Sequence, residues 1–175
     1  MLRINTAGSS RPDSGCMHLR MAQPIVPKPL RVPPLSATRG VTQAAGLMAV
    51  GAMAVACGTD AQATSTGSTA VGAQAWATHA NSAAFGNLAL AGADNSTAIG
   101  ASSRVEAGNA TAIGASASAE QANGLAIGAG TLSDGINASA VGTASQSTVT
   151  NATALGSSSF ASGINSTALG YTAQA

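Results

Sequence analysis

A strict fourteen-residue repeat constrains this chain more than any other feature of its sequence. Nine times without a gap, an alanine, an apolar residue and a glycine follow one another, first at residues 56–58 and last at residues 168–170. Seven consecutive copies open with asparagine, from Asn81 to Asn165. A unit this short cannot bury an apolar face by itself and must stack on its neighbours. The period therefore predicts a solenoid.

Composition divides the 175 residues into two unlike parts. Residues 1–40 hold all six prolines and six of the seven basic residues, whereas residues 41–175 hold one arginine and five acidic residues. Residues 1–44 are therefore predicted to be a basic, proline-rich leader that is disordered or serves in targeting. Residues 45–175 are predicted to be the repeat domain, with about nine coils of which the last is incomplete. Its scarcity of lysine and arginine argues against nucleic acid as a partner.

Residues 46–56 can be interpreted in two ways. They follow Arg39 and precede Ala-Gln-Ala at 61–63, as the apolar region and cleavage site of a signal peptide would. They also lead into the repeat, because residues 56–63 match residues 168–175 in phase, which a signal peptide has no reason to do. The repeat interpretation is favoured. No stretch is long and apolar enough to cross a bilayer, so the chain is expected to carry no membrane anchor of its own.

The two cysteines, Cys16 and Cys57, are too few for a disulfide framework. Cys57 occupies the position that isoleucine or valine fills in later copies, which favours a small buried hydrophobic residue there. A lipoprotein cysteine is the alternative, because small residues flank Cys57 on both sides.

Each coil contains two short segments of strand character when its asparagine is counted as position one. The first is expected at positions three to five, as in residues 97–99, and the second at positions nine to eleven, as in residues 117–119. The glycine at position six and the asparagine at position one suit the corners, since both residues tolerate a left-handed backbone. The sequence therefore predicts an all-β fold, a parallel β-roll with two strands per coil.

Alternation along the first strand places positions three and five on one face and position four on the other. The apolar residues at position five are predicted to form the buried core column: Val71, Phe85, Ile99, Ile113, Ile127, Val141, Leu155 and Leu169. The alanines at position four are predicted to form an oligomer face, since a second surface close by would explain why nothing larger occurs. They are Ala70, Ala84, Ala98, Ala112, Ala126, Ala140, Ala154 and Ala168.

The sequence assigns no catalytic, metal-binding or cofactor-binding residue, and the chain is predicted not to be an enzyme. His18 and His79 are isolated, and the five carboxylates of the repeat domain are interpreted as falling at unlike positions of the coil. The aromatic residues Trp76, Phe160 and Tyr171 are interpreted as falling at varied positions after the glycine and as local packing or exposed contacts.

Two further patterns are explained better by the repeat than by a function. The Asn-x-Ser/Thr motifs at Asn95, Asn109, Asn137, Asn151 and Asn165 match the glycosylation acceptor pattern. Because the repeat already requires asparagine at its corner, glycosylation is not expected. The threonine column is interrupted in several coils, which argues against the regular hydroxyl lattice of an ice-binding solenoid.

The motif Asn-Ser-Thr-Ala-Ile-Gly at 95–100, with its close copies at 109–114 and 165–170, resembles the head repeat of YadA-like trimeric autotransporter adhesins. The resemblance covers about residues 45–175. It implies a left-handed parallel β-roll, three of which associate side by side as a homotrimer. It also implies display at the outer membrane of a Gram-negative cell and attachment to host extracellular matrix or cell-surface receptors.

The sequence departs from that family in showing neither a heptad stalk nor an anchor of β-strands. The chain is therefore expected to be a fragment, a truncated product or a head whose other parts are encoded elsewhere. A structural spacer, a rod that projects another binding domain from the cell, is the alternative function. The identity of a ligand does not follow from these residues.

Overall fold

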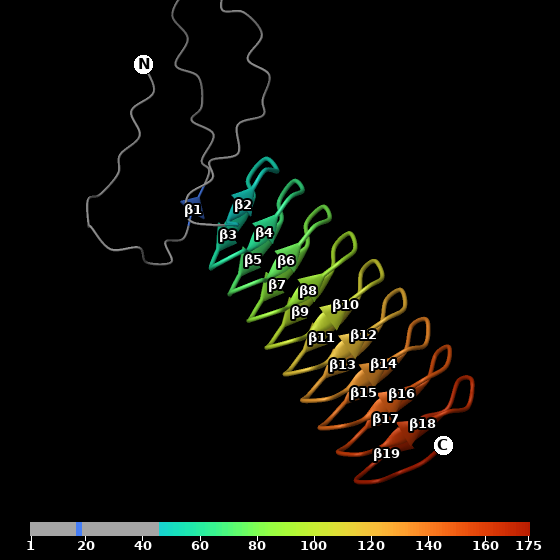
Figure 1. The fold of residues 1–175 in the computed structure, drawn as a ribbon. Helices are drawn as coiled ribbons and strands as arrows, with labels where there is room; N and C mark the ends of the chain where they lie inside the picture. The colour runs from blue at the N-terminus through green and yellow to red at the C-terminus, as the bar shows by residue number, and fades with distance from the viewer. Residues whose placement is uncertain (1–16, 19–45) are drawn as a thin grey trace, which may run out of the picture.

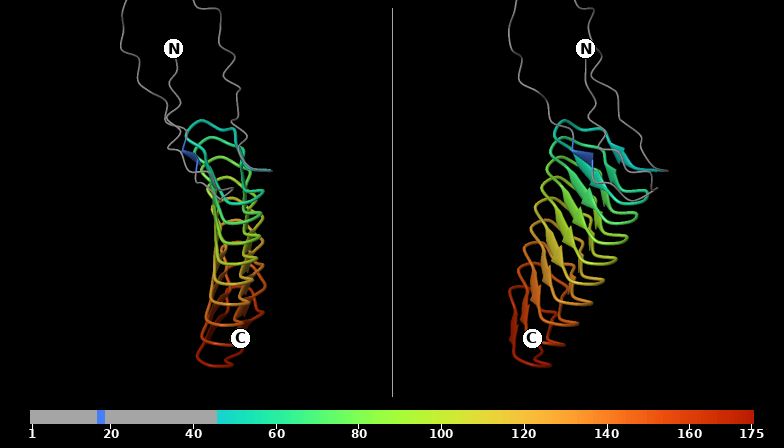
Figure 2. Two further views of the ribbon diagram at one scale, coloured as in Figure 1. Left: turned by 60° about the vertical axis from the view of Figure 1, so that its left-hand side comes forward. Right: turned by 90° about the vertical axis from the view of Figure 1, so that its left-hand side faces the viewer.

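The computed structural model describes residues 17–18 and 46–175, and residues 46–175 form a β-solenoid with two strands in each coil (Figure 1). Figure 2 shows the stacked coils as an elongated rod, with residue 46 near one end and residue 175 at the other. Among the described residues, no helix is long and apolar enough to span a membrane. Apart from residues 17–18, the leader expected at residues 1–44 lies outside the described residues.

The first strand of each coil, together with β1, belongs to a ten-stranded sheet, in which the first strands of successive coils pair with one another. Only β1 and β3 pair antiparallel, and the other neighbours are parallel. The strands are β1 (Met17–His18), β3 (Val55–Cys57), β5 (Thr69–Val71), β7 (Ala83–Phe85), β9 (Thr97–Ile99), β11 (Thr111–Ile113), β13 (Leu125–Ile127), β15 (Ser139–Val141), β17 (Thr153–Leu155) and β19 (Thr167–Leu169).

The second strand of each coil belongs to a nine-stranded sheet that is parallel throughout. Its strands are β2 (Met48–Ala49), β4 (Gln62–Ala63), β6 (Trp76–Ala77), β8 (Leu90–Ala91), β10 (Arg104–Val105), β12 (Ser118–Ala119), β14 (Leu132–Ser133), β16 (Gln146–Ser147) and β18 (Phe160–Ala161). These strands occupy positions ten and eleven, one residue fewer than the sequence indicated.

The register of both sheets equals one repeat. Ala112 pairs with Ala98 on one side and with Ala126 on the other, so identical positions of successive coils stack in columns. Coils in such a ladder lie about 4.8 Å apart. The predicted all-β parallel solenoid of fourteen-residue coils is confirmed.

Backbone geometry at the two corners explains why glycine and asparagine recur there. Gly72 has a φ of 130°, and a Cβ added to it would lie 2.5 Å from the carbonyl oxygen of Gly86 in the next coil. At the other corner Asn95 and Asn109 have φ values of 56° and 59°, which asparagine tolerates better than most residues. The amide of Asn95 also donates to the side-chain oxygen of Asn109 at 3.3 Å. The close backbone approach at one corner and the asparagine hydrogen bond at the other therefore hold each coil against the next.

The interior of the roll is filled by small side chains. Positions two, four, nine and eleven point inward and carry mostly alanine and serine, and Val105 is the largest fully buried side chain. Most buried hydroxyls are paired with nearby backbone carbonyls: Ser96 Oγ donates to the carbonyl oxygen of Ala93 at 2.6 Å, and Ser145 Oγ donates to that of Gly142 at 2.9 Å. Serine can thus replace alanine at several inward positions with its hydroxyl paired, although Ser147 Oγ and Ser166 Oγ are buried without a hydrogen-bond partner among the described residues.

Candidate functional site

The alanine column lies inside the roll, which corrects the interface predicted from the sequence. Ala70, Ala84, Ala98, Ala112, Ala126, Ala140, Ala154 and Ala168 are all buried within a single chain, at most 1% exposed. They face the small residues of the other strand across a space too narrow for larger side chains. The restriction to alanine therefore comes from the opposite wall of the same coil, and a partner is not needed to explain it.

The apolar column lies on the outside, so its assignment to the core is also wrong. Each three-residue strand buries its central residue, which turns positions three and five outward. Of the predicted core column, Phe85 is 38% exposed, Leu155 is 44% exposed and Leu169 is more exposed still. Ile99 and Ile113 are exposed as well, whereas Val71, Ile127 and Val141 are half-buried. We call the column of apolar residues at position five on the outer surface of the ten-stranded sheet the apolar face; position three beside it carries mostly threonine and serine.

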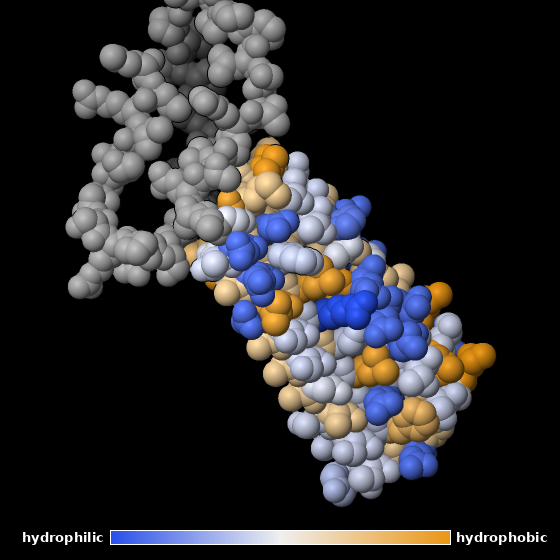
Figure 3. Space-filling model, in the orientation of Figure 1, coloured by the Kyte–Doolittle hydropathy of each residue, from blue (hydrophilic) through white to orange (hydrophobic). Residues whose placement is uncertain are grey.

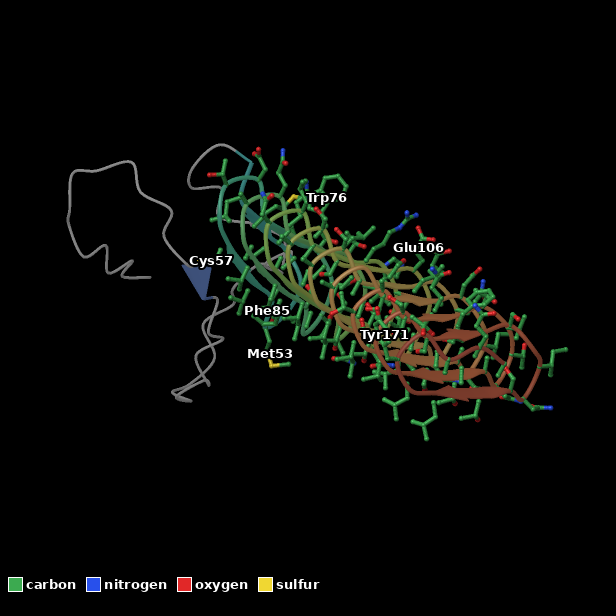
Figure 4. All side chains as sticks on the ribbon, turned by 90° about the horizontal axis from the view of Figure 1, so that it is seen from below. Met53, Cys57, Trp76, Phe85, Glu106 and Tyr171 are labelled. Carbon is green, nitrogen blue, oxygen red and sulfur yellow. The ribbon has the colours of Figure 1, made fainter. Side chains whose placement is uncertain are left out.

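The nine-stranded sheet presents a different outer surface, made by positions ten and twelve. We call it the mixed face. Trp76 is 44% exposed there, and Figure 4 shows it with Glu106 on one side of the roll while Phe85 lies on the other. Its outward residues include Gln62, Trp76, Leu90, Arg104, Glu106, Ser118, Glu120, Leu132, Asp134, Gln146 and Phe160.

Charge on the mixed face is concentrated in its middle coils. Arg104 forms an ion pair with Glu106, and the hydrogen bond and the negative charge of Glu106 raise the pKa of Arg104. One coil further on, Ser118 Oγ donates to Glu120 Oε1 at 3.1 Å. In Figure 3 strongly hydrophilic side chains gather near the middle of the rod, next to apolar ones.

Two interpretations made from the sequence need correction on this face. Glu106, Glu120 and Asp134 all occupy position twelve, so three of the five carboxylates share one position of the coil. Trp76 and Phe160 likewise share position ten, six coils apart. The fourteen-residue spacing was a sufficient signal for both columns. Nevertheless, the described residues contain no group of three or more histidine, cysteine, aspartate or glutamate side chains that could hold a metal ion.

The histidine and the motif asparagines that the sequence singled out make local contacts within the roll. His79 Nδ1 lies 3.0 Å from Thr78 Oγ1 on the surface. The asparagines of the glycosylation motifs occupy the corner with positive φ, as the repeat interpretation predicted. Asn137 and Asn151 donate to Asn151 and Asn165 respectively, at 3.2 Å and 2.9 Å.

Cys57 is disulfide-bonded and half-buried, so the expectation of a buried thiol is wrong. It is the last residue of β3, and the residue before it, Ala56, pairs with Met17 of β1. Cys16, the other cysteine of the chain, lies outside the described residues. A sequence with only two cysteines gave no indication that this one would be oxidised.

A comparison with protein families matches nearly the whole rod. The model of the YadA head domain repeat, which contains two copies of the repeat, matches residues 49–75, 63–89, 77–103, 106–131, 133–159 and 161–175. A comparison with curated proteins found no match. The successive matches are offset by about one or two coils, in agreement with the register of the sheets. The chain therefore belongs to the YadA head domain repeat family, whose members are adhesin-type domains.

Proposed function

We propose that residues 46–175 form the head of a non-enzymatic, trimeric surface adhesin that attaches a Gram-negative bacterium to host extracellular matrix or cells. The observation that carries this proposal is the uninterrupted series of family repeats, together with the apolar face that runs beside it along the rod. The family supports an adhesin-type domain, and the attachment to a host is our extension of it.

Self-association is proposed to occur through the apolar face. Apolar side chains such as Ile99, Ile113 and Leu155 repeat there from coil to coil at partial exposure, and no described residue covers them. A contiguous exposed apolar surface of this kind marks a contact site. Cyclic symmetry would allow the same face of each chain to meet near a common axis. This assigns the trimer contact to the column that the sequence had placed in the core.

The disulfide at Cys57 supports a location outside the cytoplasm. Disulfides persist mainly in oxidising compartments such as the periplasm and the cell surface. A head displayed on the outer surface meets this condition. The scarcity of charge in the rod also fits a role in which many weak contacts add up along several chains.

The test is a binding assay with the purified full chain. Collagen, fibronectin, laminin and epithelial cells are immobilised, with albumin as a blank, and binding is followed over a concentration series. Saturable binding to any of the four supports the adhesin. Absence of binding at micromolar concentration would contradict it and favour the spacer, a rod whose regular coils only set a distance.

A further inference from the structure

We propose that the part of the mixed face centred on Trp76 binds an uncharged oligosaccharide of a host glycoprotein. The proposal rests on the adhesin function proposed above, because it names the ligand class that one face of the head would take. It assigns a site to a region that the repeat itself leaves unexplained, since tryptophan occurs nowhere else in the chain.

The first argument is the shape of the surface. Trp76 lies on the outer side of β6, in register with Gln62 of β4 and with Leu90 of β8. Its neighbours in the sheet are therefore an amide and an aliphatic side chain, and the indole, 44% exposed, offers an apolar surface between them. The C–H face of a sugar ring is apolar and flat, and it stacks on such an aromatic surface.

The second argument is the set of polar groups around the platform. No hydrogen bond involves the indole Nε1 of Trp76 or the side-chain amides of Gln62 and Gln74 within the described part of the chain. Gln74 is exposed in the turn that leads into β6, where its φ is 56°. Sugar hydroxyls both donate and accept hydrogen bonds, so unpaired amides at the edge of an apolar platform match them.

The third argument is charge. The outward positions ten and twelve of the coils that hold β4, β6 and β8 carry no ionisable side chain, and charge begins only at Arg104. The nearest ionisable groups lie in turns: Asp60 holds the position of Gln74 one coil earlier, His79 follows Thr78, and Asp94 Oδ1 accepts a hydrogen bond from the backbone N–H of Ala80 at 3.0 Å. A neutral surface complements a neutral ligand better than a sulfated or sialylated one.

A proline-rich peptide fits this surface less well. Polyproline helices dock in grooves lined by several aromatic side chains. The next aromatic residue on the mixed face is Phe160, six coils away, or roughly 29 Å along the rod. A single platform suits one or two sugar rings.

The position of the site leaves it open in the proposed assembly. Trp76 and Phe85 lie on opposite sides of the roll (Figure 4). Association through the apolar face therefore does not cover Trp76, and a trimer would present three copies of the site with a gain in avidity.

The experiment uses Trp76 as its own reporter, because the full chain contains no other tryptophan. N-acetyllactosamine, chitotriose and mannotriose are titrated while the intrinsic emission is recorded, with a heparin oligosaccharide and a proline-rich peptide as comparison probes. We expect a saturable change in emission with at least one neutral sugar. Isothermal titration of Trp76→Ala should show binding about tenfold weaker or lost, and Trp76→Phe should retain part of it.

Phe160→Ala is the matched control, since Phe160 occupies the same position of its coil. It should bind the sugar like the original chain, and circular dichroism should show that both alanine variants remain folded. The proposal is overturned if no neutral sugar binds, if only heparin or the peptide binds, or if Trp76→Ala binds normally. If Trp76→Ala still binds matrix proteins while no variant binds sugar, the glycan site is rejected. The proposed adhesin function is then still supported.

Discussion

The two outer faces of the roll are built on the same period and yet differ in character. On the ten-stranded sheet, position five carries a branched or aromatic apolar residue in every coil from Val71 to Leu169. On the nine-stranded sheet, position ten changes from Trp76 to Arg104 to Gln146 within a few coils. A surface that repeats at every level suits a partner that repeats in the same way, such as a second copy of the chain. A surface that changes along the rod can hold a local site.

The interior does not share this difference. Both sheets turn small residues inward, and Ala98 of one strand and Ala91 of the other are fully buried. The contrast between the faces is therefore confined to the outside, so substitutions can separate folding from association.

The largest effect is expected inside the roll, at Ala112. Ala112→Leu introduces a side chain for which the closely packed interior has no room, and we expect a loss of about 3 kcal/mol in the free energy of unfolding. Thermal unfolding of the purified chain measures it. Thr111→Leu is the matched control, because Thr111 faces outward and Leu125 already occupies that position in the next coil. Equal destabilisation by both would show that the alanine column is not the interior.

The next effect concerns the apolar face. Ile113→Asp places a charge in the middle of the proposed contact, and we expect association at least tenfold weaker with the β-roll retained. Sedimentation over a concentration series, with circular dichroism as a check on folding, measures both properties. Gln146→Asp adds the same charge to the mixed face and should leave association unchanged. An original chain that stays monomeric at high concentration would reject the contact itself.

A smaller effect is expected at the corner that joins the two sheets. Asn109→Ala places alanine, which tolerates a left-handed backbone less well than asparagine, at a φ of 59°. It also removes the side-chain oxygen that accepts a hydrogen bond from Asn95, so we expect the free energy of unfolding to fall by about 1 kcal/mol. Asn109→Gly relieves the backbone but also lacks the hydrogen bond. Comparing the two unfolding curves separates the contributions, and an alanine variant as stable as the original would show that the corner is not strained.

The smallest effect is expected on the mixed face. Arg104→Ala removes an exposed ion pair with Glu106, and such pairs contribute little because water and salt screen them. We expect the melting temperature and the association to stay unchanged at physiological salt. A clear loss of either would mean that the mixed face takes part in assembly, which would remove the distinction between the two faces.

The repeat period predicted the solenoid, its register and the residues that share a face, because identical positions must stack when each coil pairs with the next. It did not decide which face lies inside. An unbroken alanine column fits either a narrow interior or a close contact between chains, and the bulky Ile113 was assigned to the core on hydrophobicity alone. The correct signal was present in the other inward positions, since Ser96 and Ala117 show that small residues recur on the same side as Ala112.

Other features depended on information that no local pattern contains. The pairing of Met17 with Ala56 joins segments far apart in the sequence, and the disulfide at Cys57 lies beside it. Ser145 is polar, yet it is buried with its hydroxyl bonded to a carbonyl. A serine that pairs with its own coil cannot be told from a solvated one by composition.

The orientation of the hydrogen bonds has a mechanical consequence. The bonds between coils, such as that from the N–H of Thr69 to the carbonyl oxygen of Ser82, run along the rod and hold one coil to the next. Tension between the two ends of the rod would load the successive coil interfaces in series. A coil that opened would replace about 4.8 Å of rod by fourteen residues of extended chain, which span roughly 45 Å. A single roll pulled along its axis would therefore lengthen in steps and dissipate the load instead of transmitting it rigidly.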